Sequence, residues 1–404
     1  MNNLPLHCVR VLDLSRVLAG PLCAQYLGDM GADVIKVEDV AGGDDTRSWP
    51  AFVQGADGAR TSAVFTSINR NKRSIAVNLK SPQGRELVHA LARRADVVIE
   101  SFGPGVAARL GVDAATLCAL NPRLIHCGIS GFGSVGPLRS GKGYDLILQA
   151  FSGMLLLAGE NDGPPTRSAF SPVDQATGLH ALIGVLAALY ERASTGHGRQ
   201  VEASLFDTSA AFLGYYLHNY WERKTDPDRI GVGHPSLCPY GLFETADRPI
   251  ILGIANDVLW QRFCALAGLE GHPDLAALAT NAQRAAQRAK TEALVSAALR
   301  RHGRAHWFTV LDEAGIPVSP LHTLSEFAAH PHTTASGMVY EQTDPVFGPQ
   351  KSVAQPIRID GERMPHRRHA PRHGEHTREI LAELGLDAAA SQALLDNGVV
   401  ALSN

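Results

Sequence analysis

Residues 9–38 read VRVLDLSRVLAGPLCAQYLGDMGADVIKVE, and this stretch decides the fold. Its two ends, Val9–Leu14 and Ala32–Glu38, are rich in apolar and β-branched residues and are typical of strands. Between them, Pro21 stands at the first position of a segment typical of a helix, which runs to Gly31. A strand, a helix and a second strand at this spacing predict two parallel strands joined by a right-handed crossover. Because such sheets bind ligands beyond the carboxyl ends of their strands, Ser15–Pro21 is a candidate binding loop.

The same alternation continues and predicts an α/β fold. Further strands are expected at Ile75–Leu79, Asp96–Glu100 and Leu124–Ser130. The first loop lacks the G-x-G-x-x-G spacing, so the dinucleotide-binding fingerprint is absent. From Tyr240 onward, a hairpin pattern and two helical stretches predict a smaller α+β domain. A chain of 404 residues is too long for one ordinary core. We therefore expect a large α/β domain that begins in residues 1–224, a small domain at 225–325, and a segment, 326–404, that returns to the large domain.

Composition restricts the class of protein. Hydrophobic residues make up 45% of the chain and the formal net charge is −3, so the overall charge gives no reason to expect nucleic acid or a membrane as a partner. Neither a signal peptide nor an uninterrupted apolar run of bilayer length is visible. The six cysteines form no C-x-x-C pair, which favours reduced thiols in a cytoplasmic protein and no zinc site. Four histidines near the C-terminus could share one helix face as a metal site, but Pro371 between them favours an extended strap instead: His366, His369, His373 and His376.

One carboxylate, Asp174, stands at the start of a long apolar segment that ends near Gly196. Asp174 permits two interpretations. It could be an N-cap, whose side chain accepts backbone N–H bonds, or a reactive carboxylate that the helix N-terminus directs into a cleft. The basic stretch Asn69–Ser74 also permits two interpretations, a site for an anion such as a phosphate or a solvated turn.

Several of these stretches together resemble the class III CoA-transferases, also called the CaiB/BaiF family, which includes formyl-CoA transferase. No single motif is decisive, but their order and spacing are specific and extend over nearly the whole chain. The stretches are Val11–Leu14 with Ala19–Pro21, Gly31–Glu38, Asn71–Ser74, Phe102–Gly105, Asp174 with Thr177–Gly178, and Gly196–Gln200. The resemblance implies that Asp174 is the catalytic nucleophile, and that coenzyme A is part of the substrate, with no metal and no separate cofactor.

The resemblance also implies a CoA site. It places Leu18 and Ala19 near the CoA nucleotide, and it assigns phosphate and adenine contacts to residues 71–73 and Arg109. The full set of implied CoA contacts is Leu18, Ala19, Asn71, Lys72, Arg73, Phe102, Gly103, Arg109, Lys142 and Tyr144. This chain departs from the family at Asp39, where some members have an arginine that contacts CoA. The family's glycine-rich lid has only a weak counterpart here, at Gly231–Ser236.

At the level of the whole molecule, the resemblance implies an interlocked homodimer, with a CoA-binding α/β domain and a C-terminal segment that returns to it. The implied reaction moves CoA from an acyl-CoA to a free carboxylic acid through an aspartyl-CoA thioester. In its detailed sequence, the chain is most similar to members that use dicarboxylates such as succinate and glutarate. Arg16 and Arg47 are candidates for binding the distal carboxylate of such a substrate.

Two other functions compete with this one. An α-methylacyl-CoA racemase of the same fold would pair the aspartate with a histidine in the loop Gly141–Asp145, but here Tyr144 occupies that position. The high ordinary pKa of tyrosine makes it a poor partner for two-base proton exchange at neutral pH. His126 on a neighbouring strand is more typical of a packing residue. The second alternative is a CoA-ester-binding protein without turnover, against which the retained Asp174 argues.

Overall fold

The first predicted unit forms: β1 (Arg10–Asp13) and β2 (Asp33–Glu38) are parallel neighbours connected through α1 (Ala19–Asp29). The structure is a computed structural model that describes residues 4–55 and 58–403. Side chains alternate along a strand, so Val11 and Leu12 point to opposite faces of the sheet, and each is 1% exposed. Both faces are therefore covered, as expected for a parallel sheet.

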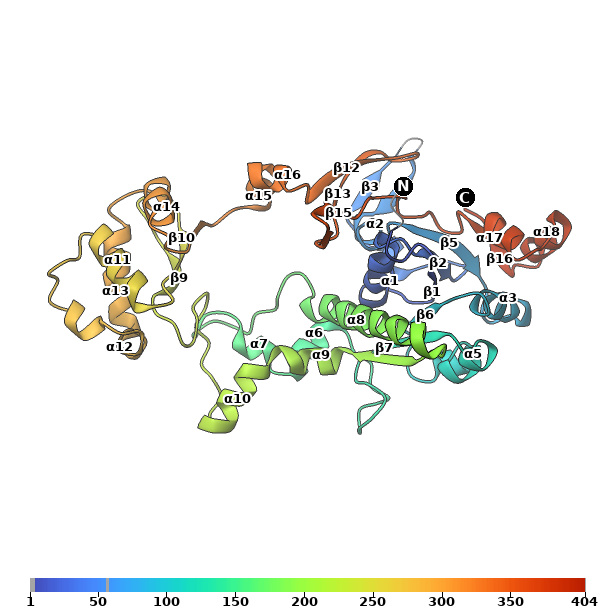
Figure 1. Cartoon of the computed structure of the whole chain (residues 1–404), viewed down its shortest axis with the longest axis horizontal. Coiled ribbons are helices and arrows are strands. Elements are labelled where there is room, and N and C mark those ends of the chain that lie inside the picture. Colours follow the sequence, from blue (N-terminus) through green and yellow to red (C-terminus); the bar gives the residue numbers. More distant parts are fainter. Residues whose placement is uncertain (1–3, 56–57, 404) are drawn as a thin grey trace. The chain divides into compact units, whose positions relative to one another are not determined.

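Within the described residues, this sheet has seven strands in the order β16-β5-β2-β1-β6-β7-β8 (Figure 1). All neighbours are parallel except β16, which is antiparallel to β5. The chain proceeds from β1 to β2 on one side and later returns to β6 on the other side of β1. The loops that follow β1 and β6 therefore diverge, which is where α/β sheets bind ligands. The other five strands are β5 (Lys72–Val77), β6 (Val97–Glu100), β7 (Ile125–Ser130), β8 (Gln200–Ser204) and β16 (Val400–Ala401).

Helices of different length cover the two faces. On one face, α1 and the long α8 (Pro172–Thr195) pack with the sheet around Val97, Ile99 and Ile125. On the other face, a second core cluster joins Leu12 and Val98 to two helices that follow β5 and β6 and to one helix of the C-terminal segment. These helices are α3 (Pro82–Ala92), α5 (Ala114–Leu120) and α17 (Thr377–Glu383).

Helix α8 is the expected long apolar helix, and it ends at the C-cap Gly196. By length and composition alone, it is also the one helix in the described part of the chain that could cross a membrane, with a mean hydropathy of 1.2. This differs from the expectation that no apolar run approaches bilayer length, because alanines between the larger side chains keep the average high. The buried Ala181, Leu182 and Val185 pack against the sheet, as in the core helix of a globular domain.

The described chain divides into two compact units. Unit 1 contains the described residues of Met1–Met154, Ser168–His218 and Pro331–Asn404, and unit 2 contains Leu155–Arg167 and Asn219–His330. The chain passes between them four times: within α7 (Met154–Leu157), after Arg167, within α10 (Gly214–Arg223) and after His330. The shorter elements of unit 1 before residue 331 are η1 (Asp45–Ser48), β3 (Phe52–Gln54), β4 (Arg60–Ser62), α2 (Ala63–Ile68), α4 (Val106–Leu110), α6 (Asp145–Phe151) and α9 (Leu205–Phe212).

The C-terminal segment is part of unit 1, but it is not simply an extended strap. After α16 (Pro331–Ala335) it contains two hairpins and the helices α17 and α18 (Ala388–Asp396). The hairpins consist of β12 (Val339–Asp344) with β13 (Gly348–Val353), and β14 (Arg358–Ile359) with β15 (Glu362–Arg363). Between the second hairpin and α17 the backbone is extended and bonds to the sheet edge. Asn71 N donates to the carbonyl of Arg368, and His376 N donates to the carbonyl of Ser74.

Unit 2 contains the predicted hairpin. Strands β9 (Tyr240–Phe243) and β10 (Ile250–Gly253) are antiparallel, and β11 (Val318–Pro320) extends the sheet. Its core gathers Phe263, Leu299 and Trp307 against this sheet. The helices of unit 2 are α11 (Asp257–Leu266), η3 (Leu275–Leu278), α12 (Asn281–Ala286), α13 (Arg288–Leu299), α14 (Arg304–Glu313) and α15 (Leu324–Ala329).

Candidate active site

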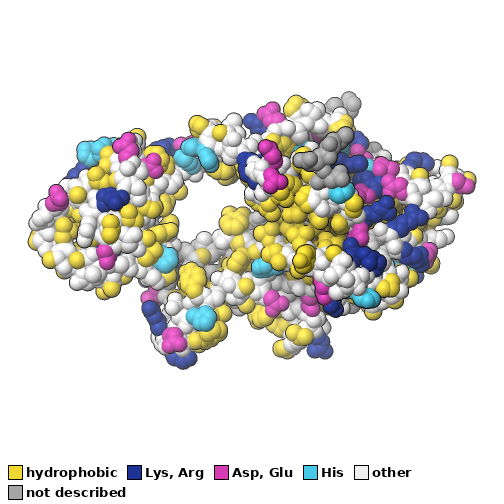
Figure 2. All heavy atoms as spheres, viewed as in Figure 1, with side chains coloured by type: hydrophobic (Ala, Val, Ile, Leu, Met, Phe, Trp, Pro, Cys, Tyr) yellow, Lys and Arg dark blue, Asp and Glu magenta, His cyan; other side chains and the backbone are white. Residues whose placement is uncertain are grey.

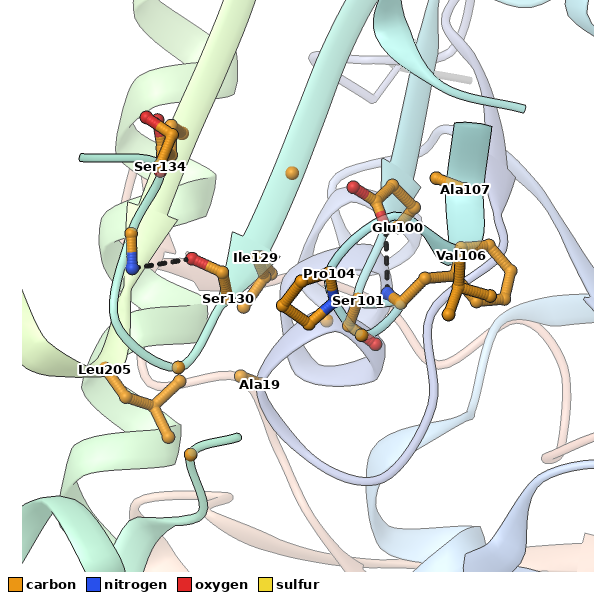
Figure 3. A pocket seen from close by; sticks show the side chains of 18 of the residues that line it. Ala19, Glu100, Ser101, Pro104, Val106, Ala107, Ile129, Ser130, Ser134 and Leu205 are labelled. Carbon is orange, nitrogen blue, oxygen red and sulfur yellow. Dashed lines mark hydrogen bonds between the residues drawn. The ribbon is translucent and has the colours of Figure 1, made fainter. Parts of the chain in front are cut away.

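A cavity of about 620 Å³ opens at the carboxyl ends of β1, β6 and β7, within unit 1. Its wall includes the loop after β1, the turn Glu100–Gly105 after β6, and the two loops Gly131–Ser134 and Gly141–Tyr144. Figure 3 shows Ala19, Pro104, Ser130 and Leu205 around it. The last two loops touch through their backbones, because a Cβ on Gly131 would lie 2.7 Å from Gly143 Cα. Glycine at these positions therefore allows the two loops to share one wall.

Asp174 lines this cavity from the first turn of α8. The helix begins at Pro172, and its N-cap is Ser171, which has a φ of 52° and makes no side-chain capping bond. The interpretation of Asp174 as the N-cap is therefore wrong. Proline at the first helical position begins the helix two residues before Asp174, which leaves its carboxyl group available to the cavity.

A second carboxylate, Asp145 at the start of α6, caps α8 instead. Its Oδ2 accepts hydrogen bonds from Val173 N at 2.8 Å and from Asp174 N at 3.1 Å. Gln149 Nε2 donates to the other oxygen of Asp145. Burial, together with the repulsion from Asp145, raises the pKa of Asp174 to about 7. Asp174 is therefore only partly ionised at pH 7.

The cavity holds another carboxyl group with a raised pKa. Glu100, at the end of β6, accepts a hydrogen bond from Phe102 N at 2.8 Å (Figure 3). Burial raises the pKa of Glu100 to about 7, and Asp113 adds to the shift. Asp45, Asp113 and Glu202 complete the acidic lining.

Three cationic side chains also line the cavity: Arg16, Arg139 and Lys142. Arg16 Nη1 lies 3.5 Å from Asp45 Oδ2, and both side chains are about half exposed. Arg47, the other residue expected to bind a distal carboxylate, does not line the cavity. Its guanidinium instead pairs with both oxygens of Glu38 at 2.7 Å and donates to the carbonyl of Pro371.

The structure brings most of the expected site residues together. The cavity lining includes Leu18, Ala19, Phe102, Gly103, Lys142, Tyr144 and Asp174. Arg109 is exposed on α4 and does not line the cavity, although Val106 and Ala107 of the same helix do.

Asn71, Lys72 and Arg73 lie elsewhere, and their position corrects both interpretations of the basic stretch. Neither a solvated turn nor an open anion site is present, because Lys72 and Arg73 belong to β5 and their side chains are 0% and 5% exposed. Lys72 pairs with Asp13 at 2.8 Å. Arg73 pairs with acidic residues from β2 and α17: Asp33, Glu379 and Glu383. Asn71 Nδ2 donates to Asp29 at 2.8 Å.

His126 also lines the cavity and is 2% exposed. Its Nε2 lies 3.5 Å from the carbonyl of Val112, and among the described residues its Nδ1 has no partner. Burial lowers the pKa of His126, so the imidazole is neutral at pH 7. Tyr144 lines the same cavity and is 65% exposed.

Sequence reasoning missed the roles of Glu100 and Asp145 in this site. Glu100 ends a predicted strand, so the rule that ligands bind at strand carboxyl ends could have indicated it. Asp145 follows the glycine pair Gly141 and Gly143, but nothing in the local sequence shows that it caps a helix almost thirty residues later.

Residues 4–55 and 58–403 contain no group of three His, Cys, Asp or Glu side chains placed to hold a metal ion. The four C-terminal histidines bond separately: for example, His373 Nε2 lies 2.8 Å from the carbonyl of Asp39, while Ser74 N donates to His376 Nδ1. All six cysteines are free of disulfides.

Comparison with known proteins gives one consistent family. The family model described as CoA-transferase family III matches residues 6–377. The succinate–glutarate CoA-transferase of Agrobacterium fabrum is 38% identical, covering 94% of this chain and 96% of that protein. The acetyl-CoA:oxalate CoA-transferase of Acetobacter aceti is 37% identical, covering 90% of this chain and 91% of that protein. A crystal structure of a CaiB/BaiF family protein from Brucella suis matches with a TM-score of 0.84 and 36% identity, covering 95% of this chain and all of that chain.

Proposed function

The chain belongs to CoA-transferase family III, and from that premise we propose that it moves CoA from succinyl-CoA to a second dicarboxylic acid with Asp174 as the nucleophile. One observation carries the proposal: Asp174 is the carboxylate that the start of α8 presents to the cavity. Its pKa of about 7 leaves an ionised fraction at neutral pH that can attack without a general base.

The proposed reaction proceeds by four exchanges without water. Asp174 attacks the donor thioester carbonyl and the C–S bond breaks. CoA departs as the thiolate, and a mixed anhydride between Asp174 and the donor acid remains. The thiolate then attacks the aspartyl carbonyl, which releases the donor acid and leaves an aspartyl-CoA thioester. The acceptor carboxylate attacks that thioester and expels CoA thiolate. Finally the thiolate attacks the acyl carbon of the acceptor, which frees Asp174 and forms the new acyl-CoA.

Each tetrahedral intermediate needs hydrogen-bond donors for its oxyanion. The amides of Val173 and Asp174 at the helix start do not serve, because both donate to Asp145. We assign the oxyanion donors to the glycine-rich loops Gly131–Ser134 and Gly141–Tyr144, whose backbones line the cavity. Gly133 N already donates to Ser130 Oγ at 3.1 Å, and Gly141 N donates to the carbonyl of Leu138 at 2.7 Å, so neither is one of them.

For CoA itself, we propose contacts from the expected residues that line the cavity: Leu18, Ala19, Phe102, Gly103, Lys142 and Tyr144. Arg109 is the one further expected residue placed close to the lining, on α4 beside Val106. Asn71, Lys72 and Arg73 are left out of this set because their polar atoms bond inside unit 1.

A dicarboxylate acceptor agrees with two observations. The relatives from Agrobacterium and Acetobacter are named for glutarate and oxalate, which are both dicarboxylates. The cavity supplies cations that could pair with a distal carboxylate, and of these Arg16 and Arg139 are arginines, which bind carboxylates through two parallel bonds. The proposed acceptor class therefore follows from names and charge together.

We also propose that the protein is a cytoplasmic homodimer, interlocked as the resemblance implies. The proposed small domain is residues 225–325, as expected from the sequence. The apolar residues on the outer face of α8 support a dimer, since Leu179, Ile183 and Tyr190 are 39%, 62% and 86% exposed. Figure 2 shows hydrophobic side chains gathered on unit 1 where Figure 1 draws α1 and α8. Six free cysteines support a reducing compartment.

A racemase of the same fold is a second candidate, because His126 shares the cavity lining with Asp174. Two bases facing one α-carbon could exchange its proton. The transferase is favoured because the Val112 contact and burial hold His126 in the sheet, and because Tyr144 occupies the position that the racemases give to histidine.

A turnover assay separates these functions. Purified protein is incubated with a panel of CoA thioesters and free acids in deuterium oxide, beside Asp174→Ala. CoA transfer from succinyl-CoA that is lost in the variant supports the proposal. Deuterium at the α-carbon of a 2-methylacyl-CoA, without transfer, would establish the racemase. Binding of CoA esters with neither reaction would indicate a protein without turnover.

A further inference from the structure

Four buried charged side chains contact the loop between β1 and α1. Asp13 ends β1, Lys36 lies in β2, Asp44 follows β2, and Lys72 begins β5. Their side chains are at most 2% exposed. Lys72 Nζ lies 2.8 Å from Asp13 Oδ2, and Lys36 Nζ lies 2.9 Å from Asp44 Oδ2. The two cations and two anions balance, so the group carries no net charge.

Each of the four also bonds to the backbone of the loop or of the first turn of α1. Asp13 Oδ1 accepts from Ser15 N at 3.0 Å and from Ser15 Oγ, and Lys36 Nζ donates to the carbonyl of Ser15 at 2.9 Å. Asp44 Oδ1 accepts from Val17 N at 3.3 Å. Lys72 Nζ donates to the carbonyl of Pro21 at 2.8 Å. The charges therefore fix the loop at its start, middle and end.

The loop needs such support because its backbone is strained. Val17 has a φ of 72°, a left-handed conformation that is sterically unfavourable for a β-branched residue. The loop lines the cavity from Arg16 to Gly20. It also packs closely on α8, because a Cβ on Gly178 would lie 2.5 Å from the carbonyl oxygen of Ala19. Asp174 is one turn away from Gly178 on that helix.

Stability alone gives little reason for this arrangement. Removing charges from water is costly, and replacing a buried ion pair by apolar residues of the same volume is often neutral or stabilising. A balanced group of four charges whose bonds converge on one strained loop is better explained by the shape that it imposes on that loop.

We infer that Asp13, Lys36, Asp44 and Lys72 form a positioning network that holds the loop Ser15–Gly20 in the conformation that binds CoA. This inference rests on the proposed function, because it takes the cavity as the CoA site. It gives Lys72 a positioning role in place of the direct CoA contact expected from the sequence. None of the four residues touches substrate in this account.

The test uses two charge-balanced pairs of substitutions, Lys36→Met with Asp44→Asn and Lys72→Met with Asp13→Asn. Each pair replaces one cation and one anion by neutral residues of similar shape. Thermal unfolding then identifies which double variant keeps its fold. The dissociation constant of free CoA is measured by calorimetry, with succinyl-CoA turnover as a second measurement. We expect a rise of about tenfold in the dissociation constant.

Val17→Gly supplies the measurement that a merely structural role would not change. Glycine adopts a positive φ without strain, so the loop no longer depends on the network. In the Val17→Gly background, we expect the substituted pair to weaken CoA binding by only about twofold, whereas Val17→Ala, the matched control, should leave the full loss. Equal losses in the two backgrounds, or an unchanged dissociation constant in a folded pair, would overturn the inference. Wild-type protein that binds CoA without transferring it would contradict the proposed function but not the network.

Discussion

At Asp174, the same helix terminus that presents the carboxyl group also fails to stabilise its charge. A helix N-terminus normally favours a negative side chain through its unpaired N–H groups. Here Asp145 takes the amides of Val173 and Asp174, and its own carboxylate repels the charge of Asp174. Burial is the larger cause, and together with this repulsion it raises the pKa of Asp174 to about 7. The ionised, nucleophilic form is therefore lost as the pH falls through 7.

The first prediction concerns Asp145→Asn. The amide keeps an oxygen that can accept both backbone bonds, but it removes the repulsion, so the pKa of Asp174 should fall. The acidic limb of the profile of kcat/KM against pH should therefore move to lower pH, in the direction set by removing the repulsion. Steady-state kinetics between pH 5 and pH 9 measure this shift.

Glu100→Gln is the matched control for that prediction. Glu100 lines the same cavity and also has a pKa of about 7, but its shift comes mainly from burial. If Asp174 is the nucleophile, the control should leave the acidic limb in place. If the acidic limb moves in Glu100→Gln and stays in place in Asp145→Asn, the limb reports the ionisation of Glu100 and not that of Asp174.

Individual residues were predictable from the sequence only where the chemistry is local. The resemblance indicates Asp174 and Phe102, and the strand-end rule indicates the loop that contains the lining residues Leu18 and Ala19. Lys72 was misinterpreted because its partner Asp13 is 59 positions away in the sequence, and a basic run does not show which carboxylates will meet it.

At the scale of elements, the contact between α1 and α8 aligns Asp174 with the loop Ser15–Gly20. Gly178 allows this contact, since a Cβ there would lie 2.5 Å from the carbonyl oxygen of Ala19. The other end of α8 is anchored by Arg192, whose Nη2 lies 2.8 Å from Asp96 Oδ1. The helix is therefore held at both ends while Asp174 remains at the cavity.

The second prediction is that Gly178→Ala separates α8 from α1. The added methyl meets backbone, which cannot rotate away, so we expect a loss of about 1–3 kcal/mol in stability and a lower kcat/KM. Thermal unfolding and steady-state kinetics measure the two effects. Gly214→Ala is the control, because a Cβ at Gly214 meets nothing within 4 Å. Equal unfolding temperatures for the two variants would show that this close contact is not needed.

Elements with regular hydrophobic patterns were predictable, and elements set by distant contacts were not. Strands β1, β2, β6 and β7, helix α1 and the hairpin β9–β10 form where apolar runs and turn residues indicated them. The start of β5 was missed because its polar Lys72 and Arg73 hide a buried strand. The hairpin β12–β13 was missed because its strands are mostly polar.

At the scale of the whole molecule, α8 presents an exposed apolar face. Isolated exposed hydrophobic residues are ordinary, but Leu179, Ile183 and Tyr190 are spaced along one helix. The third prediction is that Ile183→Asp weakens the proposed homodimer, because it places a charge in an apolar contact. Analytical ultracentrifugation of purified protein should show a dimer for wild type and a smaller dimer fraction for the variant, because interlocked chains assemble during folding and do not separate on dilution.

Leu324→Asp is the control for the third prediction. Leu324 lies in unit 2 and is 88% exposed, so its substitution tests whether any surface charge has the same effect. We expect this control to remain dimeric. Monomeric wild-type protein at micromolar concentration would contradict the proposal of a homodimer.

The central claim is that Asp174 carries CoA covalently, and intact-mass spectrometry tests it most directly. Wild-type protein and Asp174→Asn are incubated with succinyl-CoA without an acceptor acid and then denatured. The account predicts that the wild type gains the mass of one CoA less one water, that glutarate discharges this adduct, and that Asp174→Asn forms none. An adduct of the same mass on Asp174→Asn, or CoA transfer by that variant at the wild-type rate, would contradict the account.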